Sequence, residues 1–235
     1  MLLFYIRHGD PIYDPDSLTP LGERQAEALA RRLALYGIDE IYASSSNRAM
    51  LTAKPTCELL HKEMTVLDWC NEKFAGEDFF FEEDGSLEWA FQHQKYRERF
   101  VSDEIRSMGR DWHKAFADKT FKKGLDRVQK ETDAFMKSFG YEHDLERNLY
   151  NCVRENKSRI ALFAHQGFGM VFLSCLLDIP YPMFSTHFDF THTGMTVIDF
   201  SERRGAVVPR VLQLSGDSHI YRDGLPTKYQ NEIYF

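Results

Sequence analysis

The chain has 235 residues, of which 43% are hydrophobic and 28% are charged. These proportions are ordinary for a globular domain, so they exclude disordered and collagen-like chains, and the length is enough for one sizeable core. The formal net charge of -7 disfavours a protein that binds nucleic acid, and any anion site must therefore be built locally.

The first predicted unit consists of a strand, a loop and an amphipathic helix. Residues 2–6 form a short apolar run that ends at Arg7, which is typical of a strand buried on both faces of a parallel sheet. We expect this strand to be the central one. Thr19 then has the features of an N-cap, Pro20 those of the first helical position, and Gly37 those of a helix stop.

A second unit of the same kind follows. Residues 38–43 predict a strand, Ser44 to Ser46 a turn and cap, and residues 65–67 another strand after a helix that Pro55 should kink. Further strands are expected at residues 159–164, 194–200 and 207–214, and a helix at residues 168–177. Strands that alternate with helices indicate an α/β fold with a mostly parallel central sheet, flanked by helices in three layers.

The segment between these two halves is predicted to be a helical insertion. Within residues 77–157 no run has a convincing strand pattern, and the apolar spacing favours helices at residues 87–116, 125–139 and 142–155. We expect residues 1–235 to form a single domain that carries this insertion.

Polar side chains follow three of the predicted strands at their carboxyl ends. Arg7 and His8 follow the first strand, Arg48 lies just after the second, and His165 follows the strand at residues 159–164. Carboxyl ends of parallel strands share one edge of a sheet, where open α/β sheets bind their ligands. His165 also begins a helix, whose free N–H groups favour an anion. Each residue alone fits a surface or capping role, but the four together predict an anion site.

The order of these motifs resembles the histidine phosphatase superfamily, which has a phosphoglycerate-mutase-like fold. Arg7-His8-Gly9 is similar to the signature that follows the family's first strand. Residues 18–26 resemble its L-T-x-x-G-x-x-Q-A segment, residues 44–53 its S-x-x-x-R-A-x-x-T-A segment, and residues 164–167 its late strand-His-x-Gly element. The match covers most of residues 1–75 and 159–220 and leaves the insertion uncovered.

The resemblance implies a phosphatase that acts on a small phosphomonoester and needs neither a cofactor nor a metal ion. Neutral His8 would attack the phosphorus and form a phosphohistidine, which water then hydrolyses. Arg7, Arg48 and a protonated His165 would hold the non-transferring oxygens, since these cationic donors match phosphate. The insertion is expected to cover the crevice and to select the substrate.

The resemblance also implies a proton donor for the leaving oxygen. Residues 71–76 are similar to the N-E-x-x-x-G stretch of mutase-like members, which points to Glu72 as the general acid. Glu77 and Asp78 are weaker candidates, and a solvated carboxylate is also common in so acidic a segment. The residue after the second histidine is Gln166, whereas the acid-phosphatase branch has its donor carboxylate there, which favours an acid placed elsewhere.

The chain departs from the mutase-like branch at two places. After the first histidine motif that branch has Glu-Thr or Glu-Ser and then an Asn, whereas this chain has Asp10, Pro11 and Asp14. The missing Asn removes a phosphate contact, which disfavours the alternative function of a phosphoglycerate-type mutase. His192 stands where the family commonly has Asn or a small polar residue, so it is either a substrate contact or a capped surface histidine.

Two other functions are compatible with parts of the sequence. A metal hydrolase would use His187, Asp189 and His192, although no H-E-x-x-H motif or paired cysteine spacing supports it. A phospho-ligand binding or interaction module would dock a partner on the aromatic residues of the insertion, but aromatic side chains at helical spacing are more often core.

The setting expected from the sequence is the cytoplasm, without contact to membranes or nucleic acid. The four cysteines have neither C-x-x-C spacing nor the density of a disulfide scaffold, which favours a reducing compartment. The apolar run at residues 2–6 meets Arg7 too early for a signal peptide. Nothing in the pattern selects an oligomeric state.

Overall fold

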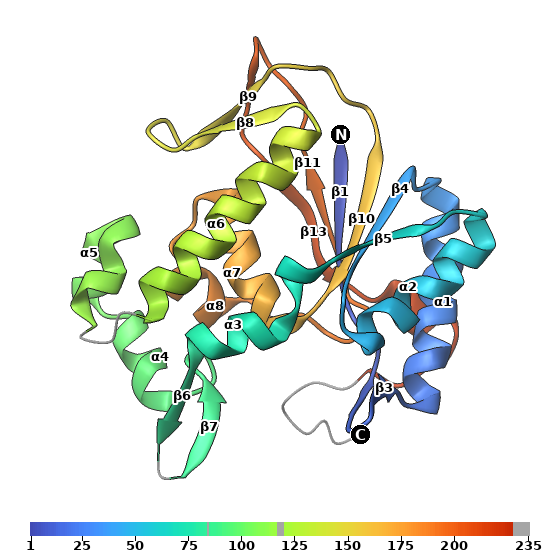
Figure 1. The fold of residues 1–235 in the computed structure, drawn as a ribbon, viewed down its shortest axis with the longest axis horizontal. Coiled ribbons are helices and arrows are strands. Elements are labelled where there is room, and N and C mark those ends of the chain that lie inside the picture. Colours follow the sequence, from blue (N-terminus) through green and yellow to red (C-terminus); the bar gives the residue numbers. More distant parts are fainter. Residues whose placement is uncertain (84, 117–119, 228–235) are drawn as a thin grey trace.

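A six-stranded sheet forms the centre of the chain (Figure 1). The computed structural model describes residues 1–83, 85–116 and 120–227. β1, β10, β4 and β5 pair in parallel, and β11 is antiparallel to both of its neighbours. The predicted α/β sheet, mostly parallel and with the first strand near its middle, is thereby confirmed. The strand order is β13 (Arg210–Gly216), β11 (Met195–Asp199), β1 (Leu2–Arg7), β10 (Arg159–Ala164), β4 (Glu40–Ser44) and β5 (Met64–Leu67).

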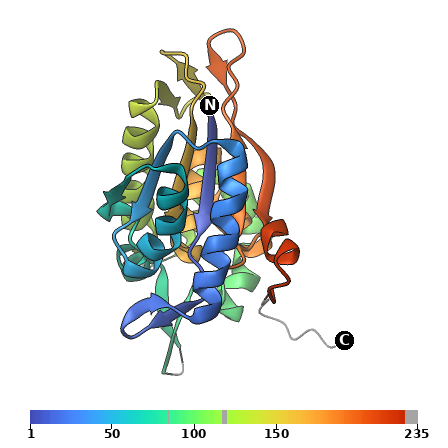
Figure 2. The same ribbon diagram turned by 90° about the vertical axis from the view of Figure 1, so that its right-hand side faces the viewer.

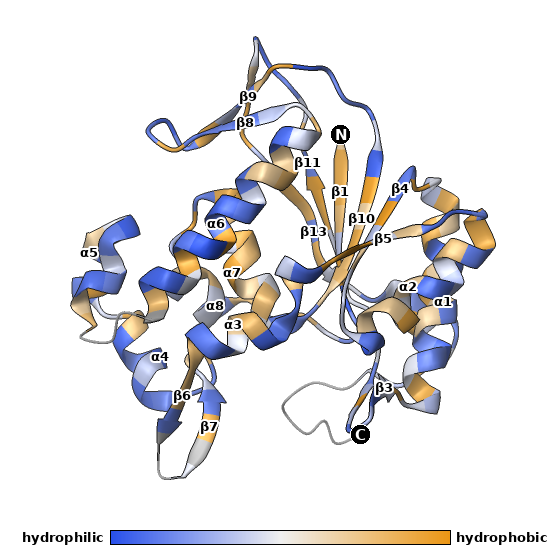
Figure 3. Cartoon of the chain, in the orientation of Figure 1, coloured by the Kyte–Doolittle hydropathy of each residue, from blue (hydrophilic) through white to orange (hydrophobic). Residues whose placement is uncertain are grey.

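Helices cover both faces of this sheet (Figure 2). The main flanking helices are α1 (Pro20–Tyr36), α2 (Asn47–Leu60), α6 (Thr120–Ser138) and α7 (Gln166–Leu177). Alternate side chains of β1 point to opposite faces of the sheet. Phe4 and Ile6 are buried with α1 and α2, whereas Leu3 and Tyr5 are buried with α6 and α7. This two-sided burial explains why β1 and β10 are apolar except at the end residues Arg7 and Arg159 (Figure 3).

The predicted helix boundaries of the first half are confirmed. The Thr19 hydroxyl accepts a hydrogen bond from the Gly22 backbone N–H at 3.1 Å, and Gly37 ends α1 in the left-handed conformation with φ 66°. The Ser46 hydroxyl caps α2 in the same way. α2 continues through Pro55, so this proline does not end the helix.

The insertion differs from the prediction, because it contains two β-hairpins. The predictions of no strand within residues 77–157 and of a helix at residues 142–155 are wrong, and the predicted helix at 87–116 begins as a strand and is then broken into short pieces. The helix predicted at residues 125–139 is confirmed as part of α6. The segment from residue 68 onward contains η1 (Asp68–Cys70), α3 (Glu72–Phe79), β6 (Phe80–Glu83), β7 (Ser86–Trp89), α4 (Gln94–Phe100), α5 (Asp103–Met108), η2 (Gly109–Ala115), α6, β8 (Tyr141–Asp144) and β9 (Leu149–Cys152).

The hairpin β8–β9 forms because its side chains find partners elsewhere in the fold. Tyr141 and Tyr150 are fully buried, and the Tyr150 hydroxyl donates to the Leu176 carbonyl oxygen of α7 at 3.1 Å. β9 also pairs with β12 (Ala206–Val207). These distant contacts outweigh the local helical preference of the polar residues in between.

The remaining described elements lie around the edges of the sheet. They are the hairpin β2 (Pro11–Tyr13) and β3 (Asp16–Leu18), and the helices α8 (Tyr181–His187) and α9 (Ser218–Arg222). The late strands predicted at residues 194–200 and 207–214 correspond to β11 and β13, the second of which begins three residues later than expected. No helix in the described part of the chain has both the length and the apolar character that a membrane span requires.

Candidate active site

Three adjacent strands bring the predicted anion-binding residues to one edge of the sheet. β10 lies between β1 and β4, and the register pairs Arg7 with Ala164 and Phe163 with Ala43. His8, His165 and Ser44 therefore emerge side by side at the carboxyl ends of these strands, in the lower part of the sheet in Figure 1. The imidazole rings of His8 and His165 lie 5.3 Å apart, centroid to centroid.

The backbone around His8 fixes its chemical state. Its Nδ1 lies 2.8 Å from the carbonyl oxygen of Gly9, and because a carbonyl only accepts, Nδ1 carries the proton. Burial is the largest cause that holds the pKa of His8 well below its usual range, and its electrostatic interactions with His165 and Arg7 act in the same direction. The imidazole is therefore neutral, with its lone pair on Nε2.

The loop after His8 is anchored to the helices beneath it. The Gly9 N–H donates to the Thr52 hydroxyl of α2 at 2.9 Å, and the Asp10 N–H donates to the Gln25 side chain of α1 at 2.8 Å. A Cβ on Gly9 would lie 2.8 Å from the carbonyl oxygen of Gly22. This close approach explains the two glycines and makes the loop rigid.

His165 is held at the N-terminus of α7 by two hydroxyl groups. Its Nε2 lies 2.8 Å from the Ser44 Oγ and 3.2 Å from the Ser46 Oγ. Its Nδ1 has no hydrogen-bond partner among the described residues and lies 3.6 Å from a carboxylate oxygen of Glu72. Burial and the nearby arginines lower the pKa of His165, so the protein groups alone keep it neutral.

Two arginines supply the positive charge of the site. Arg7 donates to the Phe190 carbonyl oxygen, and Arg48 donates to Asp16 at 2.8 Å and to Glu72 at 3.1 Å. In the part of the chain that the structure describes, the buried Nε–H groups of Arg7 and Arg48 have no acceptor. Buried donors of this kind normally find a partner, so both are suited to an anionic ligand.

Glu72 lies between these groups. It occupies the first turn of α3, its Oε1 accepts from the Gly167 N–H at 2.8 Å, and its Oε2 accepts from Arg48. The structure thus places Glu72 beside the second histidine. It does not bring the weaker candidates there: Asp78 is buried against Lys123 and Arg127 of α6, and Glu77 is exposed.

His192 lies next to His8 and is not an isolated surface residue. Its ring is 5.7 Å from that of His8, and its Nδ1 is 3.5 Å from a carboxylate oxygen of Asp10. The next residue, Thr193, donates its N–H to the carbonyl oxygens of Arg7 and His8 at 3.1 and 3.2 Å. The sequence did not indicate roles for Asp10, Thr193 or the Thr52 hydroxyl, because their contacts exist only once the loops are folded.

An open pocket of about 440 Å³ adjoins the two charged residues Arg48 and Glu72. Tyr13 of β2 and Phe80 of β6 contribute aromatic surface, and Lys73 contributes a further charge. Phe80 belongs to the insertion, so this segment does supply part of the pocket wall.

One ligand atom from each of His8, Glu72 and His165 lies within 4.8 Å of the others. Within residues 1–83, 85–116 and 120–227, this is the sole group of side chains spaced so that it could hold a metal ion. The two guanidinium groups beside it disfavour a bound cation, and Glu72 is already engaged by Arg48. The alternative ligands His187, Asp189 and His192 form no such cluster; the Asp189 carboxylate accepts from the Gln166 side chain.

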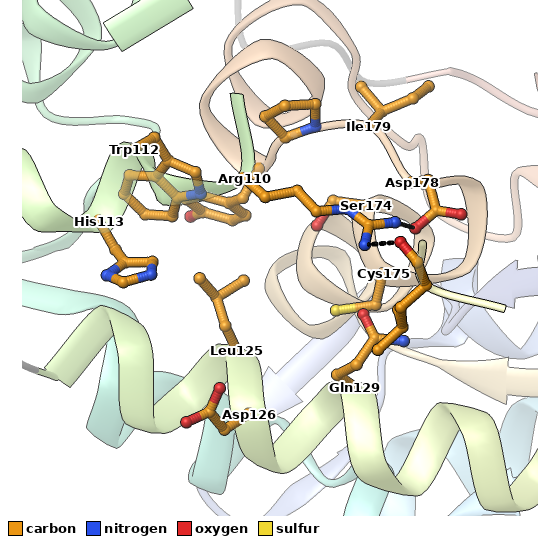
Figure 4. Close-up of a pocket in the computed structure, with 13 residues that line it drawn as sticks. Arg110, Trp112, His113, Leu125, Asp126, Gln129, Ser174, Cys175, Asp178 and Ile179 are labelled. Atoms are coloured by element: carbon orange, nitrogen blue, oxygen red, sulfur yellow. Dashed lines mark hydrogen bonds and ion pairs between the residues drawn. The ribbon is translucent and has the colours of Figure 1, made fainter. Parts of the chain in front are cut away.

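A separate cavity of about 190 Å³ lies between α6, α7 and η2 (Figure 4). Trp112, Leu125 and Ile179 give it apolar walls, and Arg110 pairs with Asp178 at its rim. None of the strand-end residues lines it. It is therefore not a candidate for the chemistry of the strand-end site.

Comparisons with known proteins find one matching family model and solved structures of similar fold. The model of the histidine phosphatase superfamily (branch 1) matches residues 3–211. A phosphoserine phosphatase from Entamoeba histolytica, solved with phosphoserine, is 19% identical with a TM-score of 0.58 over 93% of this chain and 98% of that one. A mycobacterial glucosyl-3-phosphoglycerate phosphatase is 16% identical with a TM-score of 0.57, over 91% and 98%.

A third solved structure, an alpha-ribazole phosphatase from Shigella flexneri, is 20% identical with a TM-score of 0.56, over 92% of this chain and 97% of that one. At these identities the likeness concerns the fold. A search of curated proteins finds no match.

Proposed function

The chain belongs to the histidine phosphatase superfamily, and we propose that it hydrolyses a small phosphomonoester through a phosphohistidine on His8. The observation that carries this proposal is the state of His8: a neutral imidazole with its proton on Nδ1 and its lone pair on Nε2, next to two arginines with unused buried donors. The structural neighbours described above, all phosphatases by description, support it.

In the first step, Nε2 of His8 forms a bond to phosphorus while the bond from phosphorus to the ester oxygen breaks. Arg7 and Arg48 hold the non-transferring oxygens, and the negative charge of the bound phosphate favours a proton on His165 Nδ1, which becomes a further donor. Glu72 gives its proton to the departing oxygen. The proton that Glu72 donates is taken up from solvent when the phosphate binds and Arg48 turns from Glu72 toward it.

In the second step, water attacks the phosphorus of the phosphohistidine, and the bond to Nε2 breaks. Glu72, now a carboxylate, takes the proton of the attacking water, so that inorganic phosphate leaves and both residues return to their starting states. Every atom and proton is supplied by substrate, water and these side chains. We therefore propose a reaction without a metal ion, which would proceed unchanged in EDTA.

The substrate is proposed to be selected by the pocket that contains Phe80, because that residue comes from the insertion and lines the same pocket as Arg48 and Glu72. The setting proposed is the cytoplasm, where the four cysteine thiols would remain reduced.

The proposal is tested by trapping the intermediate. Brief incubation with a phosphomonoester that carries labelled phosphorus should leave an acid-labile, base-stable label on the protein. His8→Ala should lose both the label and turnover, whereas His187→Ala, an exposed histidine outside the site, should keep both. A label that persists in folded His8→Ala would show that another residue is the nucleophile.

A further inference from the structure

A second pocket with a concentration of positive charge lies between α1 and α9. It has a volume of about 410 Å³ and lies where the short red helix packs beside the blue helix α1 (Figure 2). Three arginines line it, Arg31 and Arg32 from α1 and Arg222 from α9, together with one carboxylate, Asp223. In a chain with a formal net charge of -7, this excess of guanidinium groups is a local feature that attracts anions.

The walls of this pocket, which we call the α1–α9 pocket, combine charge with apolar surface. Arg31 pairs with Asp223, which leaves the charges of Arg32 and Arg222 uncompensated among the lining residues. Leu35 and Tyr36 lie on the same wall. The combination fits a ligand that has a doubly charged phosphate or phosphonate at one end and an apolar or aromatic group at the other.

Arg32 connects the pocket to the interior. It donates to the Gly216 carbonyl oxygen at 3.2 Å and to the Gln213 side chain at 2.9 Å, and its Nη1 lies 3.5 Å from Nδ1 of the buried His219. Because a guanidinium only donates, Nδ1 is the acceptor in this contact. Burial and the charge of Arg32 lower the pKa of His219 to about 4, so the ring is neutral and carries its proton on Nε2.

The chain of hydrogen bonds continues from His219 to the strand-end site. Nε2 of His219 lies 2.9 Å from the Thr193 hydroxyl, which in turn donates to the His192 carbonyl oxygen at 2.7 Å. The Thr193 N–H is the group that donates to the carbonyl oxygens of Arg7 and His8. A displacement of Arg32 is thus passed through two side chains to the backbone that positions the proposed nucleophile.

We propose that the α1–α9 pocket binds a small organic phosphate, and that its binding changes turnover at the strand-end site by drawing Arg32 away from His219. The Arg32–His219 contact, at 3.5 Å, is the longest in this series of hydrogen bonds, so it is the first that an incoming anion would break. The turnover part rests on the proposed function; the binding part does not.

The binding part is tested with phenylphosphonate, a dianion with an aromatic ring and no hydrolysable ester. Calorimetry at fixed ionic strength should find two sites per chain in the parent protein. Arg31→Gln with Arg222→Gln should weaken one site by more than about tenfold and leave the other. Arg48→Ala should do the reverse, and Arg24→Gln, an exposed arginine of α1 outside the pocket, should change neither. If no site of the parent is weakened in the double variant, the proposal is overturned, whether the parent shows one site or two.

The coupling part is tested by kinetics with p-nitrophenyl phosphate. Phenylphosphonate should change kcat by about fivefold or more in addition to any competitive effect on KM, and the double variant should show the competitive effect alone. Thr193→Val keeps the shape of the side chain but breaks the hydrogen-bond chain, so it should retain both binding sites and lose the kcat effect. A kcat effect of parental size in either variant would contradict the coupling. If the protein hydrolyses no phosphomonoester, the proposed function fails, while the calorimetry still decides whether the pocket binds the anion.

Discussion

The imidazole of His8 is positioned by contacts that begin at the very next residue. Its Nδ1 is bonded to the Gly9 carbonyl, the Gly9 N–H is bonded to Thr52, and Thr52 donates in turn to the Arg48 carbonyl oxygen at 2.7 Å. The proposed nucleophile and one arginine of the proposed phosphate site are therefore linked through a single threonine. Such preorganisation matters because misplacement of a reacting group by about 1 Å can reduce the rate about a hundredfold.

Glu72→Gln is the variant that separates proton donation from phosphate binding. An alkyl phosphate should lose about ten- to a thousandfold in turnover, whereas p-nitrophenyl phosphate should lose far less, because its leaving phenolate needs little help from an acid. Single-turnover measurements should place the loss in the formation of phosphohistidine, with inorganic phosphate binding retained. Equal losses on both substrates would assign the proton donor to another group.

The residues proposed to bind phosphate are tested together with vanadate, which mimics the five-coordinate phosphorus. Arg7→Ala, Arg48→Ala and His165→Ala should each weaken vanadate binding at fixed ionic strength, since the three side chains reach the site from β1, α2 and the N-terminus of α7 and are proposed to share one anion. His187→Ala is the matched control. A folded variant that binds vanadate as the parent does would remove that residue from the site.

Sequence alone predicted those residues of the site whose positions are determined by the end of a strand. Arg7, His8 and His165 directly follow or end buried apolar strands, and the parallel arrangement dictates that they meet. Asp10 could not be placed in the same way. Its contact with His192 joins two loops whose paths no local pattern encodes, and the same applies to Thr193.

Among the elements, the hairpin β8–β9 is held by a buried charge cluster. The His143 side chain is 1% exposed and lies 2.7 Å from Asp133 of α6 and 3.0 Å from Asp178 at the end of α7. Its ring stacks on Tyr150 at 4.2 Å. Burial alone would lower the pKa of His143, but the hydrogen bonds to the two carboxylates outweigh it and raise the pKa to about 9.

This pKa makes the stability of the protein dependent on pH. The folded state binds the His143 proton more tightly than the unfolded state, so the stabilisation is complete below about pH 6.5 and is lost as the pH rises through about 9. The shift corresponds to roughly 3 kcal/mol. His143→Gln should therefore lower the free energy of unfolding by about that amount at pH 6 and by much less at pH 10.

Urea denaturation at the two pH values measures this difference, with His187→Gln as an exposed control. The same loss at both values would mean that His143 acts through packing and not through its charge.

The charge cluster around His143 also explains why the sequence pattern favoured a helix in this segment. Residues 141–144 are mostly polar, and only partners on α6 and α7 make a strand the better arrangement for them.

At the scale of the whole molecule, the insertion and the sheet share one hydrophobic core. A single buried cluster contains Leu3 and Leu162 of the sheet together with Phe79, Phe100 and Phe121 of the insertion. The helical insertion expected from the sequence is thus not an appendage that closes over a finished domain. It completes the core on one face of the sheet, and we expect the two parts to unfold together.

Phe121→Ala tests this cooperativity. The side chain is fully buried and its ring lies 4.9 Å from those of Trp112 and Phe81, so its removal should cost about 3–5 kcal/mol. Unfolding followed by far-ultraviolet circular dichroism and by inorganic phosphate binding should shift together, and Phe121→Leu should be milder. Separate transitions for the two probes would show that the insertion is an independent folding unit.

The position of β10 between β1 and β4 has a further consequence for how the chain comes to fold. Leu2 pairs with Arg159, and Ile41 with Ala161, so neither early strand has a neighbour on that side until a segment far downstream is present. During synthesis, the emerging chain would carry both edges of β1 and one edge of β4 unpaired through the whole of the insertion, which is the kind of species that aggregates and that chaperones protect. The long sequence separation of these strand pairings also predicts slow folding, with the edge of the proposed active site assembled in one of the last events.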